Sequence, residues 1–189
     1  MKEGFRSQRL LFRVPNAHDA ELMRAYFDEN RAHLEPWEPD RPDGFYTTAF
    51  WEDRLQTAAL EARERVSLRL VLLQSERIVG TVNFVNVIRG AFQSCTLGYS
   101  MAHYAQGKGL MREALLESIP FAFDYLEMHR IQAGYQPHNE RSGRLLERLG
   151  FEKEGYAKDY LWIAGAWRDH IITAIRRDMP LGERRMQGV

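Results

Sequence analysis

A glycine-rich turn, Gln106-Gly107-Lys108-Gly109, stands immediately before a stretch with the apolar spacing of a helix. The first N–H groups of a helix have no partner within it, the helix dipole is positive there, and glycine lets a ligand approach the backbone closely. These residue types at this spacing therefore predict an anion site of the kind that holds a phosphate. The Gly-x-Gly pattern alone is a weak signal, because phosphate loops of this kind are common.

Two familiar nucleotide-binding loops do not fit this turn. A Walker loop needs four residues between its glycines and then Gly-Lys-Ser/Thr, whereas Lys108 alone separates Gly107 from Gly109. The dinucleotide fingerprint needs a third glycine where this chain has Arg112. The turn is therefore expected to hold a different phosphate-bearing ligand.

A second motif follows at residues 137–155, which read Pro-His-Asn-Glu-Arg-Ser-Gly-Arg-Leu-Leu-Glu-Arg-Leu-Gly-Phe-Glu-Lys-Glu-Gly. The combination of a Gln-Gly-x-Gly turn with a later Asn-x-x-Ser helix that ends in Leu-Gly-Phe resembles the GNAT superfamily of N-acetyltransferases. In that superfamily the first element holds the pyrophosphate of coenzyme A, and the second flanks its pantetheine arm. The resemblance implies acetyl-CoA as the co-substrate and an amine as the acceptor.

Five more segments narrow the resemblance to one branch, the ribosomal-protein alanine N-terminal acetyltransferases. These segments are Leu34-Glu-Pro-Trp-Glu-Pro39, Asn83-Phe-Val-Asn-Val-Ile-Arg-Gly90, Gly98-Tyr-Ser100, Gly155-Tyr-Ala-Lys-Asp-Tyr160 and Trp167-Arg-Asp-His170. The resemblance runs from about Ser7 to about Arg177, so it implies one acetyltransferase domain in residues 1–189 with a core at about 7–177. It also implies that the acceptor is the N-terminal alanine of a ribosomal protein.

The resemblance assigns coenzyme contacts to two stretches and one further residue. The strand residues would bond the pantetheine and the thioester through their backbone, and the amide near Ser100 is the candidate donor to the developing oxyanion. The turn and the first helical residues would hold the pyrophosphate, mainly through backbone amides. Asn139 would contact the coenzyme while also capping its helix. The full set is Leu97, Gly98, Tyr99, Ser100, Gln106, Gly107, Lys108, Gly109, Leu110, Met111, Arg112 and Asn139.

Acetyl transfer from a thioester to an amine offers three places for help: a base, an oxyanion donor and an acid for the leaving thiolate. In many GNAT enzymes the acid is a Tyr seven positions after the helix-capping Asn, but this chain has Leu146 there. Ser142 lies one turn earlier on the same helix face, and the resemblance implies a Ser in place of the Tyr. Ser142 is therefore the candidate acid, although a Ser is also common in the first turn of a helix.

No carboxylate stands out by its spacing as the base. Glu38, in the Pro-Trp-Glu-Pro loop, is one candidate that would face the acceptor amine. Asp159 and Tyr160 follow in a later strand and are candidates for the other wall of the site. A peptide N-terminal amine has an ordinary pKa of about 7.7–8.0, so a chain of water molecules would also serve.

The elements that must position these residues follow from the apolar periodicity. Strands are expected at residues 10–14, 66–74, 78–88, 94–102, 131–136, 154–163 and 167–176, and helices at about 19–27, 48–65, 109–127 and 139–149. The proline-rich residues 35–44 indicate a loop in which Trp37 serves as a packing anchor. Strands followed by crossover helices predict a mixed α/β class. Together with the resemblance, this implies a GNAT fold with a mostly antiparallel twisted sheet of about seven strands and helices on both faces.

Composition excludes several classes. Lys plus Arg and Asp plus Glu are 26 each, so the chain lacks the basic excess of a dedicated nucleic-acid binder. No apolar run is long enough to span a membrane, and residues 1–6 lack an apolar signal core, so we expect a cytoplasmic protein. The single Cys95 excludes an intramolecular disulfide, and the histidines show no metal-ligand spacing, so no metal is expected.

Residues 28–53 are rich in Asp and Glu, with Arg31 and Arg41 as their basic residues. This stretch is either a solvated loop or a surface that attracts a basic acceptor. The leading prediction is acetyl transfer to a protein N-terminus. Transfer is expected to be direct, in a ternary complex, because Cys95 is implausible as a covalent acetyl carrier. The alternatives are a small-molecule N-acetyltransferase, for polyamines, aminoglycosides or amino-acid derivatives, and a non-catalytic coenzyme-binding or ribosome-associated module. The feature that discriminates between them is the length of the groove, because a peptide needs an open channel between residues 35–44 and 160–167.

Overall fold

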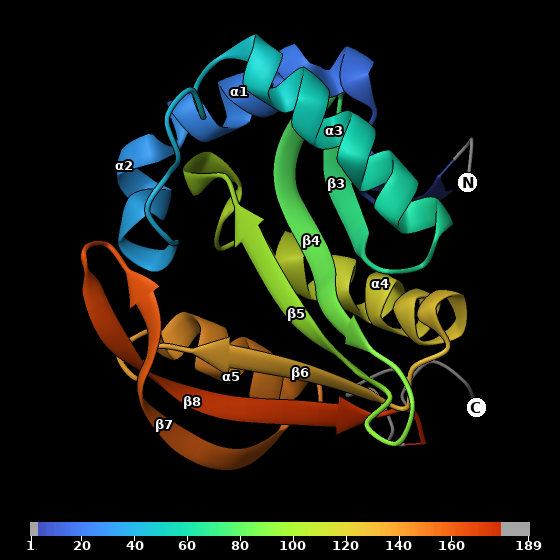
Figure 1. The fold of residues 1–189 in the computed structure, drawn as a ribbon, viewed down its shortest axis with the longest axis vertical. Helices are drawn as coiled ribbons and strands as arrows, with labels where there is room; N and C mark the ends of the chain where they lie inside the picture. The colour runs from blue at the N-terminus through green and yellow to red at the C-terminus, as the bar shows by residue number, and fades with distance from the viewer. Residues whose placement is uncertain (1–3, 179–189) are drawn as a thin grey trace.

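The structure, a computed structural model, describes residues 4–178; residues 1–3 and 179–189 of the expected domain lie outside that range. The described residues form one sheet of eight strands in the order β1-β2-β3-β4-β5-β6-β8-β7 (Figure 1). Neighbouring strands are antiparallel except β5 and β6, which are parallel. The strands are β1 (Phe5–Arg6), β2 (Leu11–Arg13), β3 (Leu68–Gln74), β4 (Arg77–Ile88), β5 (Ser94–Met101), β6 (Arg130–Tyr135), β7 (Glu152–Ile163) and β8 (Ala166–Arg176).

Helices cover both faces of this sheet, as expected. In Figure 1, α3 crosses in front of β3 and β4, whereas α4 passes behind them. The helices are α1 (Ala20–Glu29), α2 (Arg31–Leu34), α3 (Thr48–Arg63), α4 (Leu110–Leu126) and α5 (Glu140–Arg148), with 3₁₀ turns at Ala17–Asp19, Glu35–Trp37 and His103–Ala105. The mixed α/β prediction is therefore confirmed, and the sheet gains the two-residue strand β1, which is too short to leave a periodic pattern.

The expectation for Trp37 is wrong in part. Its loop begins with a 3₁₀ turn, and the indole lies over the ring of His138, with 5.2 Å between ring centroids. The side chain nevertheless remains 36% exposed. The anchors of this region are Phe27, Phe45 and Trp51 instead, which are buried against one another.

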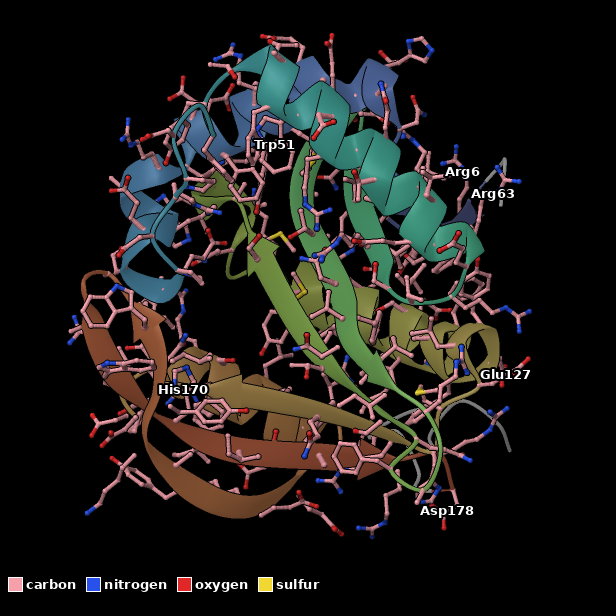
Figure 2. The ribbon with its side chains drawn as sticks, viewed as in Figure 1. Arg6, Trp51, Arg63, Glu127, His170 and Asp178 are labelled. Atoms are coloured by element: carbon pink, nitrogen blue, oxygen red, sulfur yellow. The ribbon has the colours of Figure 1, made fainter. Side chains whose placement is uncertain are left out.

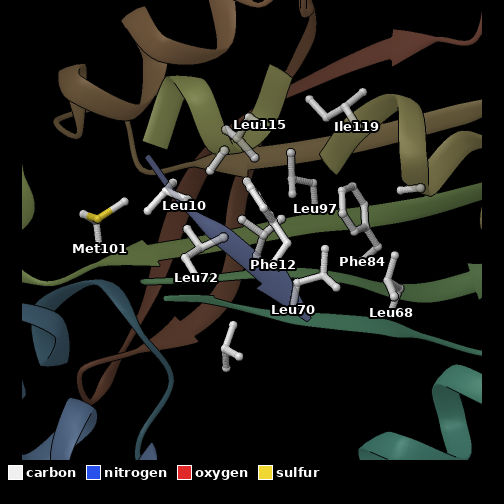
Figure 3. Close-up of a cluster of buried hydrophobic side chains, with 14 of the residues drawn as sticks. Leu10, Phe12, Leu68, Leu70, Leu72, Phe84, Leu97, Met101, Leu115 and Ile119 are labelled. Atoms are coloured by element: carbon white, nitrogen blue, oxygen red, sulfur yellow. The ribbon is translucent and has the colours of Figure 1, made fainter. Parts of the chain in front are cut away.

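The main core lies between the sheet and α4. Successive residues of a strand point to opposite faces, so Leu68, Leu70 and Leu72 share one face of β3. Figure 3 shows these side chains with Leu115 and Ile119 of α4, in a cluster of fully buried residues. Arg69 and Val71 therefore belong to the opposite face of β3, which lies beneath α1 and α3. The face of β3 toward α4 is thus apolar, whereas the opposite face carries the charged side chain of Arg69.

Strands β5 and β6 part soon after they begin. Their parallel pairing covers Ser94 to Thr96 of β5 and ends where Thr96 meets Gln132 of β6. Beyond that point β5 keeps its antiparallel partner β4 as far as Met101. The later residues of β5 therefore have a strand on one side only.

Candidate active site

The parting of β5 and β6 opens a cleft of about 1290 Å³. Residues of the sheet, of α3 and of the first turns of α4 and α5 line it. In Figure 2, Trp51 reaches it from the helical side and His170 from β8, across the molecule. Among the predicted site residues, Lys108 and Asp159 are not part of its lining, whereas all the others are.

The glycine-rich turn has the backbone shape of an anion site. Gly107 and Gly109 have φ angles of 72° and 74°, which side-chain-bearing residues rarely adopt. The first helical hydrogen bond of α4 runs from the amide of Glu113 to the carbonyl of Gly109. The amides of Leu110 and Met111 precede that bond, so they have no partner within the helix. This arrangement suits the pyrophosphate of coenzyme A.

Arg9, which the sequence did not single out, fixes this turn from the side. Its Nη1 donates to the carbonyl of Lys108 at 2.9 Å, and its Nε donates to the Glu113 carboxylate at 2.6 Å. Burial alone would raise the pKa of Glu113, but the hydrogen bonds from Ser7 and Arg9 hold that pKa below its usual value. The ionised carboxylate therefore keeps Arg9 in place, and Arg9 keeps one carbonyl of the turn directed away from an anion.

Gln106 connects the turn to the helices on the other side of the cleft. Its amide oxygen accepts a hydrogen bond from Arg141 Nη1 at 2.6 Å, and its amide nitrogen lies 2.7 Å from His33 Nε2. The His33 ring also bonds the backbone carbonyl of Met101. Burial lowers the pKa of His33, and the neighbouring His103 acts in the same direction. A neutral His33 accepts from Gln106 and donates to Met101, so the turn, α2 and β5 form one network.

The backbone of β5 offers groups to a ligand at the parting. The Ala102 amide donates to the Val79 carbonyl of β4 at 2.8 Å. Hydrogen-bonded pairs alternate along an antiparallel ladder, so Ser100 also directs its amide to β4. The amides of Tyr99 and Met101, on either side of Ser100, therefore face the parting, and they are the nearest candidates for the oxyanion donor.

Side chains of β5 face both sides of the sheet. Ser100 lies beneath α1, where its hydroxyl is 2.8 Å from Tyr26 Oη and 2.9 Å from Thr81 Oγ1. Tyr99 points to the opposite face, and its hydroxyl is 2.6 Å from Ser142 Oγ. Burial raises the pKa of Tyr99 to about 12, so its phenol stays protonated near neutral pH. Tyr99 and Ser142 thus form a hydroxyl pair that joins β5 to α5 across the parting.

The start of α5 depends on Asn139 and Gly143. Asn139 Oδ1 caps the helix by accepting from the Ser142 amide at 3.2 Å, so the hydroxyl of Ser142 takes no part in the cap. A Cβ on Gly143 would lie 2.8 Å from the buried ring of Tyr135 on β6. The glycine therefore lets α5 approach β6 closely enough for Ser142 to reach Tyr99.

The candidate bases occupy different surroundings. Glu38 lines the cleft and is ion-paired with Arg41. Tyr160 also lines it, with its ring 5.4 Å from that of His170. Asp159 is exposed in an irregular part of β7, where its φ is 47° and its amide donates to Asp169 at 2.9 Å.

His170 is a further candidate base that the sequence analysis missed. It lines the cleft, is 3% exposed and has Nδ1 2.9 Å from the carbonyl of Arg168. Because a carbonyl only accepts, the ring proton is on Nδ1, and Nε2 of the neutral ring carries a lone pair. An inward position in the last strand was the available signal, but the sequence alone does not tell which strand face lines a site.

The charges along the cleft are mainly positive. Glu38 is the one acidic residue among the described residues that line it. The acidic stretch at residues 28–53 instead forms ion pairs elsewhere, such as Asp28 with Arg24 and Glu35 with Arg31. Residues 28–53 therefore do not give the cleft an acidic lining that would attract a basic acceptor. The arginines along the cleft are Arg41, Arg54, Arg69, Arg112, Arg141, Arg144 and Arg148.

Within the described part of the chain, neither a metal-binding cluster nor a helix that could span a membrane is present. No group of three or more His, Cys, Asp or Glu residues there is placed to hold a metal ion. No helix within residues 4–178 is both long and apolar enough to cross a membrane.

Comparison with known proteins gives agreement along most of the chain. A family model described as an acetyltransferase (GNAT) domain matches residues 9–152. The ribosomal protein uS5-alanine N-acetyltransferase of Escherichia coli (strain K12) is 46% identical over 171 residues, which cover 89% of this chain and 88% of that protein. The region matched by the family model contains both the glycine-rich turn and most of the motif at residues 137–155.

Two solved structures are similar throughout the fold. The ribosomal-protein-S5-alanine acetyltransferase of Vibrio fischeri has a TM-score of 0.88 at 39% identity, and the match covers 93% of this chain and 98% of that one. RimJ of Mycobacterium smegmatis, solved in complex with CoA-disulfide, has a TM-score of 0.84 at 31% identity, with 92% and 85% covered.

Proposed function

Since the chain belongs to the GNAT acetyltransferase family, we propose that it acetylates the N-terminal amine of a ribosomal protein that begins with alanine. It is an acetyl-CoA-dependent N-acetyltransferase. The observation that carries the choice of acceptor is the 46% identity, over 89% of the chain, to an enzyme that acts on the alanine of uS5.

The channel expected for a peptide acceptor, between residues 35–44 and 160–167, is not open in the structure. Trp162 Nε1 donates to Asp40 at 2.8 Å, so the β7–β8 hairpin touches the loop at residues 35–44. The space between those two segments is therefore bridged. The cleft instead continues beneath α3, where Ala58 and Arg69 line it. An extended N-terminal segment would enter along that face of the sheet.

The residues that would hold acetyl-CoA fall on the other face. The amides at the start of α4 would bind the pyrophosphate, and the backbone of Leu97 and Tyr99 would bond the pantetheine. Asn139 would flank that arm from α5. An amide next to Ser100 would donate to the carbonyl oxygen as negative charge develops there. When bound, the thioester supplies the acetyl group and a thiolate leaving group.

Proton transfer then requires an acid and a base on opposite sides of the thioester. Ser142 would donate its proton to the leaving sulfur and recover one from Tyr99, whose phenol is protonated at neutral pH. Glu38 and His170 are the candidate bases for the acceptor amine, directly or through water. Tyr160 would line the wall between them, while Asp159 would act only by shaping β7. The amine attacks the acetyl carbon directly, since Cys95 is 1% exposed and burial raises its pKa to about 12.

The proposal also covers the organisation and location of the enzyme. One domain, with a core at about residues 7–177, carries the whole site. The reaction would take place in the cytoplasm, where ribosomal proteins are made.

The direct test follows CoA release with acetyl-CoA and three acceptors. These are a peptide that begins with alanine, the same peptide with its N-terminus blocked, and spermidine. We expect turnover on the free peptide only, with mass spectrometry placing the acetyl group on the α-amine. Turnover on spermidine alone would overturn the proposal, because it would show that the enzyme takes small cationic amines.

A further inference from the structure

Two arginines with a single counter-ion line the part of the cleft between α3 and β3. Arg54 Nη1 lies 3.8 Å from one oxygen of Glu61, and Arg69 Nε lies 3.5 Å from the other. Glu61 also accepts a hydrogen bond from Ser67 Oγ at 2.7 Å. Two positive charges thus share one carboxylate whose acceptor capacity is already partly used.

Three buried donors along the cleft lack an acceptor in hydrogen-bond geometry. Within residues 4–178, Arg69 Nε, Arg41 Nε and Trp51 Nε1 make no hydrogen bond, although all three atoms are buried. All three residues line the cleft. Buried donors are nearly always paired in folded proteins, and an unpaired one costs free energy. The missing partner is therefore a group that accepts hydrogen bonds.

The electrostatic setting favours an acceptor that is also negatively charged. Burial lowers the pKa of Arg69, the neighbouring Arg54 lowers it further, and Glu61 offsets only part of these two effects. A second carboxylate beside the two guanidinium groups would offset both effects. Glu38 is the one acidic residue among the described residues that line the cleft, and it is ion-paired with Arg41. The protein itself therefore supplies no second carboxylate to this pair.

The sheet register sets the distance from this pair to the reacting centre. Arg69 pairs with Asn83 of β4, and Asn83 pairs with Gly98 of β5. These residues form one row on the face beneath α3, and neighbouring strands are about 4.8 Å apart, so the row spans about 10 Å. An extended peptide advances about 3.3 Å per residue. A side chain two or three residues after the acetylated one would therefore reach Arg69.

We propose that Arg69 and Arg54 bind the carboxylate of an acidic side chain at the third or fourth residue of the acceptor. This inference rests on the proposed function, because it assumes that a polypeptide N-terminus enters the cleft. It defines the class of acceptor more narrowly: an N-terminal alanine followed closely by Asp or Glu. Charge-assisted hydrogen bonds to a guanidinium would then select the segment as well as hold it.

The test compares matched peptides that differ at one position. Each begins with alanine, and Glu, Gln or Lys is placed at residue 3, 4 or 8. Both turnover and the Kd for binding to the CoA-saturated enzyme are measured. We expect Glu at residue 3 or 4 to raise kcat/KM, and to tighten binding, about tenfold or more over Gln. Glu at residue 8 lies beyond the reach of Arg69 and should give no advantage.

Three variants assign the effect to the proposed residues. Arg69→Gln should reduce the Glu-over-Gln preference to less than about twofold, in both kcat/KM and Kd. Glu61→Gln removes the internal competitor, so it should strengthen the preference. Arg63→Gln is the matched control, because Arg63 is exposed at the end of α3 and does not line the cleft (Figure 2).

Each outcome is decisive. Equal binding of the Glu and Gln peptides by the wild-type enzyme overturns the inference, even if both are acetylated. A preference that persists in Arg69→Gln also overturns it. If no peptide is acetylated but the Glu peptide binds more tightly through Arg69, the acidic subsite stands and the proposed function fails. Thermal unfolding of each variant checks that it is folded.

Discussion

At the scale of single residues, the proposed acid catalysis depends on two hydroxyl groups held across the parting of β5 and β6. Ser142 stands in the first turn of α5 with its amide, not its hydroxyl, used by the cap, so the hydroxyl is available for chemistry. Tyr99 lies 2.6 Å from it and supplies a second hydroxyl from β5. A lone serine is a poor acid, but a serine that is reprotonated by a neighbour completes a relay.

Replacement of the serine tests this relay. Ser142→Ala should lower kcat about 100-fold, because general acid catalysis typically contributes that much or more. The Kd for acetyl-CoA should change little, since the Asn139 cap is untouched. Steady-state kinetics gives kcat, and titration calorimetry gives the Kd for acetyl-CoA.

Matched variants separate chemistry from structure. Ser142→Thr keeps a hydroxyl and should recover part of the lost activity. Tyr99→Phe should lower kcat less than Ser142→Ala, because Ser142 can then exchange protons with water. Equal kcat values for wild type and Ser142→Ala would remove Ser142 from the mechanism.

At the scale of elements, sequence patterns predict the positions of strands and helices, because these depend mainly on interactions between residues close in sequence. Each expected strand and helix is present, because apolar periodicity and helix ends depend on neighbours in sequence. The strand expected from residue 66 begins at Leu68, since α3 runs to Arg63 and the chain then turns through Arg65, which has a φ of 56°. Contacts between distant segments were not predictable, as Arg9 on the glycine-rich turn shows. His170 was missed for the same reason: its value depends on which elements surround it.

The close approach of α5 to β6 is an element-level feature that can be tested. Gly143→Ala should lower acetyl-CoA affinity about tenfold, because its Cβ would meet the Tyr135 ring at 2.8 Å and push α5 outward. Alanine favours a helix over glycine by about 1 kcal/mol, but overpacking typically costs about 1–3 kcal/mol, so the clash outweighs the gain. Titration calorimetry gives the affinity.

Gly155 provides the control for this substitution. A Cβ there would meet nothing within 4 Å, so Gly155→Ala should leave affinity and stability unchanged. Unaltered coenzyme binding in Gly143→Ala would show that α5 does not need its close contact with Tyr135.

At the scale of the whole molecule, two parts of one sheet meet over a short distance. Strands β1 to β5 form one part and β6 to β8 the other, and pairing between the two parts ends at Thr96 and Gln132. Coenzyme and acceptor would occupy opposite faces at this junction. Two buried ionisable side chains, Tyr26 and Cys95, are neutral in the folded protein and lie in the part that contains β5, so its stability depends on their protonation.

Stability should therefore fall in alkaline solution. Burial raises the pKa of Tyr26, and it raises that of Cys95 to about 12. Unfolded Cys and Tyr release their protons near about pH 8.5 and 10, whereas the folded protein retains them, so their stabilisation is complete below these values and is lost as pH rises. Between about pH 10 and 12 each group should cost about 1.4 kcal/mol of unfolding free energy per pH unit.

Urea unfolding at a series of pH values measures this loss. Tyr26→Phe removes one of these groups and should give a shallower decline above pH 10 than the wild type, with its stability at pH 8 taken as its own reference. A wild-type unfolding free energy that is constant from about pH 8 to 11 would contradict the argument.

The burial of Cys95 also determines how the enzyme responds to oxidation. Thiol–disulfide exchange requires an accessible thiolate, and this side chain is 1% exposed and remains protonated. Cys95 is the only cysteine in the sequence. The protein therefore has no thiol with which the free coenzyme can form a mixed disulfide, and oxidised coenzyme should neither block its cleft covalently nor change its activity over time.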